Sequence, residues 1–386
     1  MNQGCKQNKA RGLLSTAAAA VILFLAVSSY GQVRVAPGVT YREIKREEIP
    51  WSIQVLEASY KTPSLALGVE LGGEHIIGIE PLNHLMERVL ATGHQAIAGV
   101  NGDFYILKAG PFQGDPIGFC VENGELMSSP INRSALVILE DGSLVIDRFR
   151  LNAYIRGPDG AEYKLSGVNQ YCRANGIVLI TPRFNGKTRP QENSVILLAG
   201  PLPKPLGPQG TYTFTVAEKH GGDSETSIPP DRVIFIGRGT GAEFLDGIEP
   251  GEPVVCVLDV DPSPGTILHA IGGGPRLLRN GKISIEASEE GIAESFVETR
   301  HPRTAVGFNG NSLFIVTVDG RQEGYSAGMN LPELAGFLKD LGAKDAFNLD
   351  GGGSTTMWVN GHICNRPSDG RIRPIANALL LFNSSP

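Results

Sequence analysis

The run NLDGGGSTT at residues 348–356 places an acid, three glycines and three hydroxyl side chains next to one another. Apolar segments flank it at 346–349 and 357–359. This pattern predicts a strand, a glycine-rich turn and a second strand, with Asp350 at the mouth of the turn. Glycine weakens a strand and usually marks a tight turn or a close approach to the backbone. The ordinary alternative is a tight hairpin that carries a solvated acid.

Other polar clusters also stand where apolar segments end. They are NGD at 101–103, GGGPR at 272–276, RHPRT at 300–304 and DGR at 319–321. Loops at strand ends are where sites are usually built on a rigid scaffold. The alternative for these clusters is a buried polar network that braces the loop ends.

Together the clusters offer groups that suit a phosphorylated substrate. The guanidinium groups of Arg276, Arg303 and Arg321 can fork onto a phosphate, and glycine runs can present backbone N–H groups to an anion. The carboxylates of Asp103, Asp319 and Asp350 are the candidate catalytic groups, or ligands of a hard cation.

Histidine gives no independent signal in this chain. His301 precedes a proline in an extended segment, and the other histidines lack metal-ligand spacing. No G-x-S-x-G elbow precedes a helix, so a Ser-His-Asp triad is not indicated.

The composition favours a folded protein with many turns, and the order of the expected strands and helices favours the α+β class. The chain has 386 residues, and its Gly 49 and Pro 26 are spread without a period, which indicates short strands separated by turns. The net charge is -6 and no basic stripe is present, so we expect no nucleic-acid partner.

The N-terminus has the pattern of a signal peptide over residues 1–31. Lys6, Lys9 and Arg11 precede an apolar run at 13–27, and small residues follow at 29 and 31. About 15 apolar residues are short for a membrane span, so we expect cleavage, export to the periplasm or cell exterior, and no stable span afterwards. An uncleaved N-terminal anchor is the alternative.

Four cysteines follow the signal segment, at Cys120, Cys172, Cys256 and Cys364. Export permits one or two disulfides among them, whereas four buried free thiols are the equal alternative.

We expect a mixed sheet with packed helices, rather than a sandwich, after a short N-terminal lead-in. A strand and helix region covers 32–94 and the main domain covers 95–382, with a β-rich middle at about 140–265. Helical spacing predicts a helix at 82–91 and another from Leu331, capped by Asn330 with Glu333. The apolar run 313–318 predicts a strand that is covered on both faces.

The order of several motifs resembles the phosphodiester glycosidase family. These are NGDFY (101–105), GGGPRLLRNGK (272–282), RHPRTAVGF (300–308), VDGR (318–321), NLDGGGSTTM (348–357) and PSDG…RPIANAL (367–379). The resemblance runs from about 95 to 382 and is dense after 270. Residues 140–265 carry little that matches.

The resemblance implies hydrolysis of the bond between the anomeric carbon of an N-acetylglucosamine-like sugar and a phosphodiester. It implies the catalytic residues Asp350, Asp319 and Asp103. It implies binding residues Arg303, Thr304, Arg276, Arg321, Asn101, Gly274, Gly351, Gly352, Gly353, Ser354 and Thr355. The substrate would be a sugar phosphate or a glycopolymer of the cell envelope.

The sequence requires no cofactor and leaves room for a divalent cation, Ca²⁺ or Mg²⁺. Either Asp350 or Asp319 could activate water or attack the sugar, and retention or inversion stays open. Two other functions remain as alternatives: a non-catalytic polysaccharide-binding protein, and a metal-dependent phosphodiesterase that cuts the P–O bond.

Overall fold

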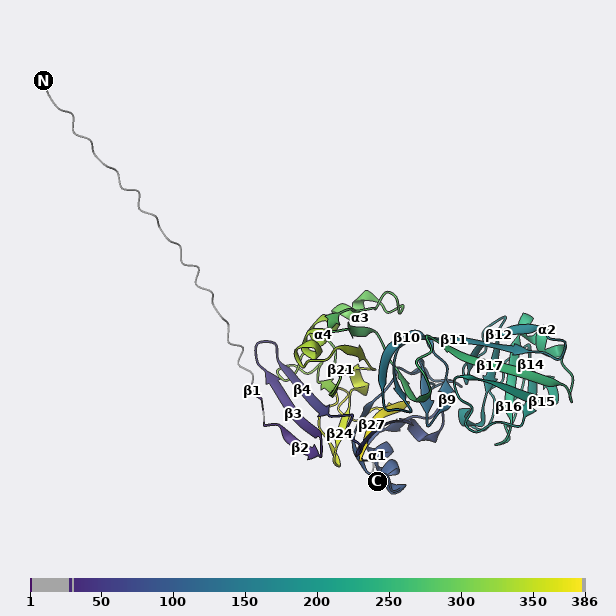
Figure 1. Ribbon diagram of the computed structural model, residues 1–386, viewed down its shortest axis with the longest axis horizontal. Coiled ribbons are helices and arrows are strands. Elements are labelled where there is room, and N and C mark those ends of the chain that lie inside the picture. The colour runs from purple at the N-terminus through teal and green to yellow at the C-terminus, as the bar shows by residue number, and fades with distance from the viewer. Residues whose placement is uncertain (2–27, 30, 384–386) are drawn as a thin grey trace.

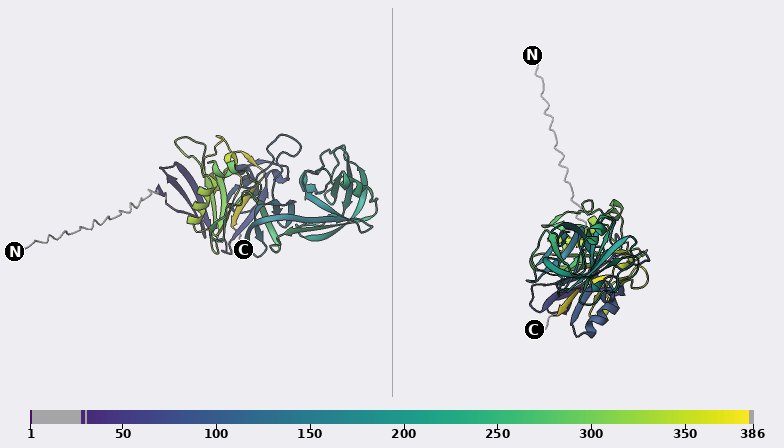
Figure 2. Two further views of the ribbon diagram at one scale, coloured as in Figure 1. Left: turned by 90° about the horizontal axis from the view of Figure 1, so that it is seen from above. Right: turned by 90° about the vertical axis from the view of Figure 1, so that its right-hand side faces the viewer.

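The computed structural model describes residues 1, 28–29 and 31–383, so most of the expected signal segment lies outside the described residues. The molecule is elongated, with a layered body at one end and a ring of strands at the other (Figures 1 and 2). In the described part of the chain, no helix is long and apolar enough to cross a membrane.

Two sheets pack face to face in the layered body. The first contains, in spatial order, β1 (Ser28–Ser29), β3 (Val39–Arg46), β4 (Trp51–Ala58), β22 (Leu313–Val318), β21 (Arg303–Phe308), β23 (Asp345–Asn348), β19 (Arg276–Arg279) and β20 (Lys282–Ile283), with β2 (Val33–Ala36) paired to β3. The second contains β25 (His362–Ile363), β24 (Met357–Val359), β7 (Ala96–Asn101), β27 (Asn377–Asn383) and β5 (Leu65–Leu71). A short ribbon of β26 (Pro374–Ile375) and β6 (Glu80–Pro81) lies beside them.

A helix covers the outer face of each sheet. Helix α4 (Leu331–Asp340) packs on Phe314, Val316 and Val318 of the first sheet. Helix α1 (Leu82–Ala91) packs on Ala378 and Leu380 of the second. The alternate residues of the same strands form the shared core between the sheets. The body is therefore a helix–sheet–sheet–helix sandwich.

The remaining large sheet curls into a ring. Its order is β12 (Glu162–Val168), β13 (Ile177–Ile180), β16 (Val233–Arg238), β14 (Ser194–Gly200), β15 (Gly210–Gly221), β17 (Pro253–Asp261), β11 (Leu144–Arg156), β10 (Ile131–Leu139), β18 (Ile267–Gly272), β8 (Cys120–Glu122) and β9 (Glu125–Ser128). Because β12 also pairs with β11, the strands from β12 round to β11 close on themselves. Two further helices, α2 (Thr240–Asp246) and α3 (Glu294–Glu298), lie against the ring and the body respectively.

Several local predictions are confirmed. Helix α1 spans the predicted residues, and every residue of β22 is buried, as its apolar sequence predicted. Helix α4 has the full capping box: Glu333 N–H donates to Asn330 Oδ1 over 2.9 Å, and the Asn330 N–H donates to Glu333 Oε2 over 3.0 Å. The strands β22 and β23 that flank this helix lie on either side of β21.

The fold class is confirmed in its coarse form, because strands dominate and helices pack on them. The structure differs from the prediction in that a second sheet covers the first, and adjacent strands are antiparallel apart from β12 and β13 within the described residues. All four cysteines are free, and Cys120, Cys172 and Cys256 are buried, as in the free-thiol alternative.

Replacing Asn330 by alanine should lower the free energy of unfolding by about 1 kcal/mol, because the helix loses its side-chain N-cap. Asn330→Asp should keep most of this energy, since its carboxylate can accept the same N–H bond. Denaturant titration of the two variants measures the difference. Equal losses in both would contradict a role for the cap.

Candidate functional site

A cavity of about 210 Å³ opens beside the glycine loop at one end of the sandwich. Its wall is formed by Phe296, His301, Arg303, Arg321, Asp350, Gly351, Gly352, Gly353 and Arg373. The glycine loop leaves β23 in the first sheet and leads to β24 in the second. The alternative of a tight hairpin is therefore wrong, because the two strands belong to different sheets.

Arg303 is a fully buried guanidinium in this wall. Its Nε donates to Met329 O over 2.9 Å, and its Nη2 donates to Phe296 O and Thr299 O over 2.8 and 2.9 Å. Its Nη1 has no partner among the described residues, and the Phe296 ring lies 4.5 Å below the guanidinium carbon. Burial and the nearby Arg321 lower the pKa of Arg303 to about 10.

Two further guanidinium groups reach the cavity. Arg321 follows β22 with a backbone φ of 58°, a conformation that is costly for a residue with a side chain and is often found at functional sites. Arg373 is anchored by Asp369, whose Oδ2 accepts from Arg373 Nη2 over 2.7 Å. Within the described residues, neither Arg303 nor Arg321 forms an ion pair with a carboxylate, in contrast to Arg373.

Asp350 is the carboxylate of the cavity wall. Its Oδ1 accepts from the Gly351 N–H over 2.8 Å. Burial raises the pKa of Asp350 to about 6, against the lowering effects of Ser354, Gly351, Arg373 and Arg321. The group is thus mostly ionised at pH 7 but gains a proton under mildly acidic conditions.

The glycines of the loop leave room for the arginines. A Cβ atom on Gly352 would lie 3.0 Å from Nη1 of Arg321, and one on Gly353 would lie 2.1 Å from Nη2 of Arg373. A Cβ on Gly351 would meet Pro302 O at 2.6 Å. The sequence led us to expect that these glycines contact an anion directly. In the structure, Gly352 and Gly353 let guanidinium groups approach the loop closely, and Gly351 lets it pass close to Pro302.

Asn101, at the end of β7, ties the two sheets together at this point. Its Nδ2 donates to Asp350 O over 2.7 Å, and its Oδ1 accepts from Thr304 Oγ1 over 2.7 Å and from Thr356 N over 3.1 Å. The Asp350 N–H in turn donates to Gly102 O over 2.9 Å. Asn101 and Thr304 are buried behind the cavity wall and position Asp350. Thr355, also buried, lies behind it too, and its carbonyl accepts from Asn365.

The other two candidate carboxylates do not line the cavity. Asp103 accepts from the N–H groups of Phe104 and Gly118 over 2.7 and 2.6 Å, and burial raises its pKa to about 7. Asp319 accepts from Tyr325 Oη and Asn365 Nδ2 over 2.9 and 3.1 Å, and burial raises its pKa as well. Both carboxylates hold loops in place.

The described residues contain no group of three or more His, Cys, Asp or Glu side chains that could hold a metal ion. Asp103, Asp319 and Asp350 therefore do not form the set of oxygen ligands that the metal-dependent alternative would require.

Arg276 and Gly274 also lie outside the cavity wall. The Arg276 guanidinium is paired with Asp345, at the other end of β23 from Asp350, and with Asp147 over 3.4 Å. Gly274 exchanges hydrogen bonds with Asn348, whose Nδ2 donates to Gly274 O over 2.9 Å. Both residues brace the sheet that carries the glycine loop.

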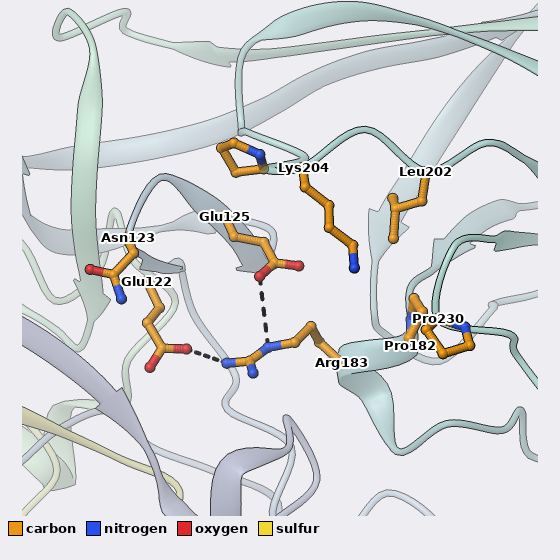
Figure 3. Close-up of a pocket in the computed structure, with 9 residues that line it drawn as sticks. Glu122, Asn123, Glu125, Pro182, Arg183, Leu202, Lys204 and Pro230 are labelled. Carbon is orange, nitrogen blue, oxygen red and sulfur yellow. Dashed lines mark hydrogen bonds and ion pairs between the residues drawn. The ribbon is translucent and has the colours of Figure 1, made fainter. Parts of the chain in front are cut away.

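A larger cavity, of about 630 Å³, lies between the β8–β9 turn and the loops around Pro182, Leu202 and Pro230 (Figure 3). Its two acids are matched by two bases: Arg183 pairs with Glu122 and lies 3.8 Å from Glu125, and the exposed Lys204 is the second base. The smaller cavity is the better candidate site, because its Arg303, unpaired among the described residues, is fully buried beside a carboxylate.

The part of the chain that forms the cavity wall is also the part that resembles a known family. Residues 210–382 match the phosphodiester glycosidase family. The resemblance seen in the motifs is thereby confirmed over these residues, which include the whole cavity wall.

Two mammalian proteins with the name N-acetylglucosamine-1-phosphodiester alpha-N-acetylglucosaminidase are similar to this chain. The mouse protein is 32% identical over 157 residues, which cover 38% of this chain and 27% of that protein. The human protein is 36% identical over 123 residues, which cover 29% of this chain and 23% of that protein. The similar region thus spans about a quarter of each relative.

A hypothetical protein from Synechocystis has a similar solved structure, with a TM-score of 0.77 and 21% identity. The alignment covers 91% of this chain and 63% of that one. At this identity the likeness supports the fold alone.

Three residues of the cavity wall were absent from the predicted site. Arg373 lies in the PSDG…RPIANAL motif, so its position could have been suspected. His301 stands two residues before the predicted Arg303, but its sequence context gave no role. Phe296 has no sequence signal, because only the fold of the chain brings α3 under Arg303.

Replacing Gly353 by alanine should displace the Arg373 side chain from the cavity wall. Binding of inorganic phosphate should weaken by about tenfold, because the phosphate loses a hydrogen bond from the Arg373 guanidinium. The fold should survive, because the clash involves the flexible ends of Arg373 and Asp369. Titration calorimetry measures the affinity. Gly336→Ala on α4, where a Cβ meets nothing within 4 Å, is the matched control. Equal affinities in the two variants would contradict this role of Gly353.

Proposed function

We propose that the chain hydrolyses the bond between a sugar anomeric carbon and a phosphodiester, with an N-acetylglucosamine-like sugar as the substrate class. The products are the free sugar and a phosphomonoester. The proposal rests mainly on the fully buried Arg303, which lies in the same cavity wall as Asp350. Among the residues that the structure describes, its Nη1 has no hydrogen-bond partner and its guanidinium has no carboxylate partner.

A buried cation without a counter-ion is costly, so the cavity favours an anionic ligand. Taking a charge out of water costs several kcal/mol unless a partner compensates it. Three backbone carbonyl groups offset part of this cost for Arg303, but they supply no negative charge. A phosphate between Arg303 and Arg321 would supply it, in the forked geometry that guanidinium groups favour.

The presence of Arg303 and Arg321 also limits the catalytic role that Asp350 must fill. A departing phosphomonoester is stabilised by Arg303 and Arg321, so a separate acid to protonate it is less necessary than for a simple glycoside. Asp350 then acts at the sugar carbon, either as the attacking carboxylate or as the base that activates water. Asp103 and Asp319 support this site through the loops that they anchor.

We also propose that the protein acts outside the cytoplasm. The basic residues followed by the apolar run at 13–27 support export.

Asp350→Asn should lower kcat by at least about 10³-fold while substrate binding is retained, because an amide can neither attack the sugar nor take a proton from water. The amide oxygen can still accept from Gly351 N–H, so the loop should keep its shape. The assay incubates the protein with an N-acetylglucosamine-1-phosphodiester and identifies products by mass spectrometry and phosphorus NMR. Asp340→Asn, the same change at an exposed end of α4, is the control.

The products separate the proposed function from its alternatives. Free sugar with a phosphomonoester supports the glycosidase. Sugar-1-phosphate would instead show cleavage of the P–O bond, and saturable binding without products would show a binding protein.

The value of kcat/KM should fall as the pH decreases through about 6, because the reactive form of Asp350 is the carboxylate and its pKa is raised to about 6. Below this pKa, the rate should drop about tenfold for each pH unit. Measurement of kcat/KM between pH 4 and pH 8 gives the midpoint of this acidic decrease. A midpoint near the ordinary aspartate pKa would contradict the assignment of the decrease to Asp350.

A further inference from the structure

We infer that His301 is held by Arg321 as the neutral tautomer with its proton on Nε2, and that it donates this N–H to the phosphoryl group of the substrate. The inference rests on the proposed function and adds to it a neutral donor among the cationic ones. His301 lies in the cavity wall with Arg303, Arg321 and Asp350.

The contact with Arg321 fixes the tautomer. Nη2 of Arg321 lies 3.2 Å from Nδ1 of His301. A guanidinium nitrogen can only donate in a hydrogen bond, so Nδ1 must be the acceptor and cannot carry a proton. In a neutral imidazole the other nitrogen then carries it. Nε2 is therefore an N–H donor, and no hydrogen bond to it occurs within the described part of the chain.

The backbone and neighbouring groups hold the imidazole in place. The His301 N–H donates to Met329 O over 3.1 Å, and the Met329 N–H donates back to His301 O over 3.0 Å. The Phe296 ring lies on one side, with its centroid 6.5 Å from that of the imidazole. The backbone bonds fix the main chain of His301, and the contacts with Arg321 and Phe296 orient its ring, so the donor is positioned before any ligand arrives.

The surrounding charges keep the imidazole neutral. The charged groups of the cavity wall are Arg303 on β21, Arg321 after β22, Arg373 before β26 and Asp350 after β23. Burial, and then the charges of Arg303 and Arg321, lower the pKa of His301 below its ordinary value. A protonated Nδ1 would also have to break the bond with Arg321.

This arrangement has a consequence for the reaction. A neutral N–H adds a hydrogen bond to the phosphoryl oxygens without adding another positive charge close to Arg303. It also means that His301 cannot serve as the base at Nε2, because that nitrogen already carries a proton. The activation of water or the attack on sugar is then left to Asp350.

Nitrogen-15 NMR of histidine-labelled protein tests the tautomer directly. At pH 7, the His301 signals, assigned by their loss in His301→Gln, should be those of a neutral ring protonated at Nε2. Addition of inorganic phosphate should shift the Nε2 signal. A ring protonated at Nδ1, a doubly protonated ring, or a signal that ignores phosphate would overturn the inference.

Two variants test the contribution to binding and turnover. Glutamine can accept from Arg321 through its oxygen and donate through its amide, so His301→Gln should keep kcat/KM and phosphate affinity within about threefold. His301→Ala should lower both by about 10- to 100-fold, because a hydrogen bond to a charged phosphoryl group is lost. His362→Ala, at an exposed histidine on β25, is the control and should match the wild type. Equal values for the glutamine and alanine variants would overturn the inference.

The experiments also separate this inference from the proposed function. If phosphate shifts the Nε2 signal but no phosphodiester is hydrolysed, the proposed function fails, whereas the donor role toward phosphate is supported. If the alanine variant hydrolyses the phosphodiester at the wild-type rate, the inference about His301 fails and the proposed function stands.

Discussion

The site depends on one crossing of the chain between the two sheets. Residues 349–356 leave β23 and enter β24, and the side chain of Asn101 holds both ends of this crossing through Asp350 O and Thr356 N. Because Asn101 itself belongs to the second sheet and also contacts Thr304 of the first, the position of Asp350 is fixed by the packing of the whole sandwich. A shift between the sheets would move the carboxylate directly.

Around this crossing, Arg303 and Arg321 carry positive charges that no carboxylate neutralises among the described residues. Most arginines with a close carboxylate lie elsewhere in the described structure, as Arg276 and Arg88 do. Arg303 and Arg321 have backbone or imidazole partners in place of acids. Gly352 and Gly353 leave room for the guanidinium groups of Arg321 and Arg373 to lie close to the loop. Charge, burial and loop shape therefore favour the same kind of ligand, a phosphate group bound next to a carboxylate.

The sequence predicted the parts of the fold that depend on near neighbours. The capped helix α4, the buried strand β22 and the acid after β23 follow from patterns a few residues long. The second sheet does not, because β7 pairs with β24 and β27, which lie more than 250 residues further along the chain. The same limit applies to the site. Asp103, Asp319 and Asp350 all follow strands, and only distant partners such as Gly118 and Asn365 decide which carboxylate faces the cavity.

The strand order has a consequence for dividing the protein into parts. The residues that match the family begin at Gly210, the first residue of β15, inside the closed ring. Within the sandwich, β22 pairs with β4, and β27 lies between β5 and β7, whose residues all precede 210. A fragment of residues 210–382 would therefore expose the edges of β22 and β27 and would lack Asn101. The unit that sequence similarity delimits is smaller than the unit that can fold, and the missing strands are as much a part of the site as the residues in its wall.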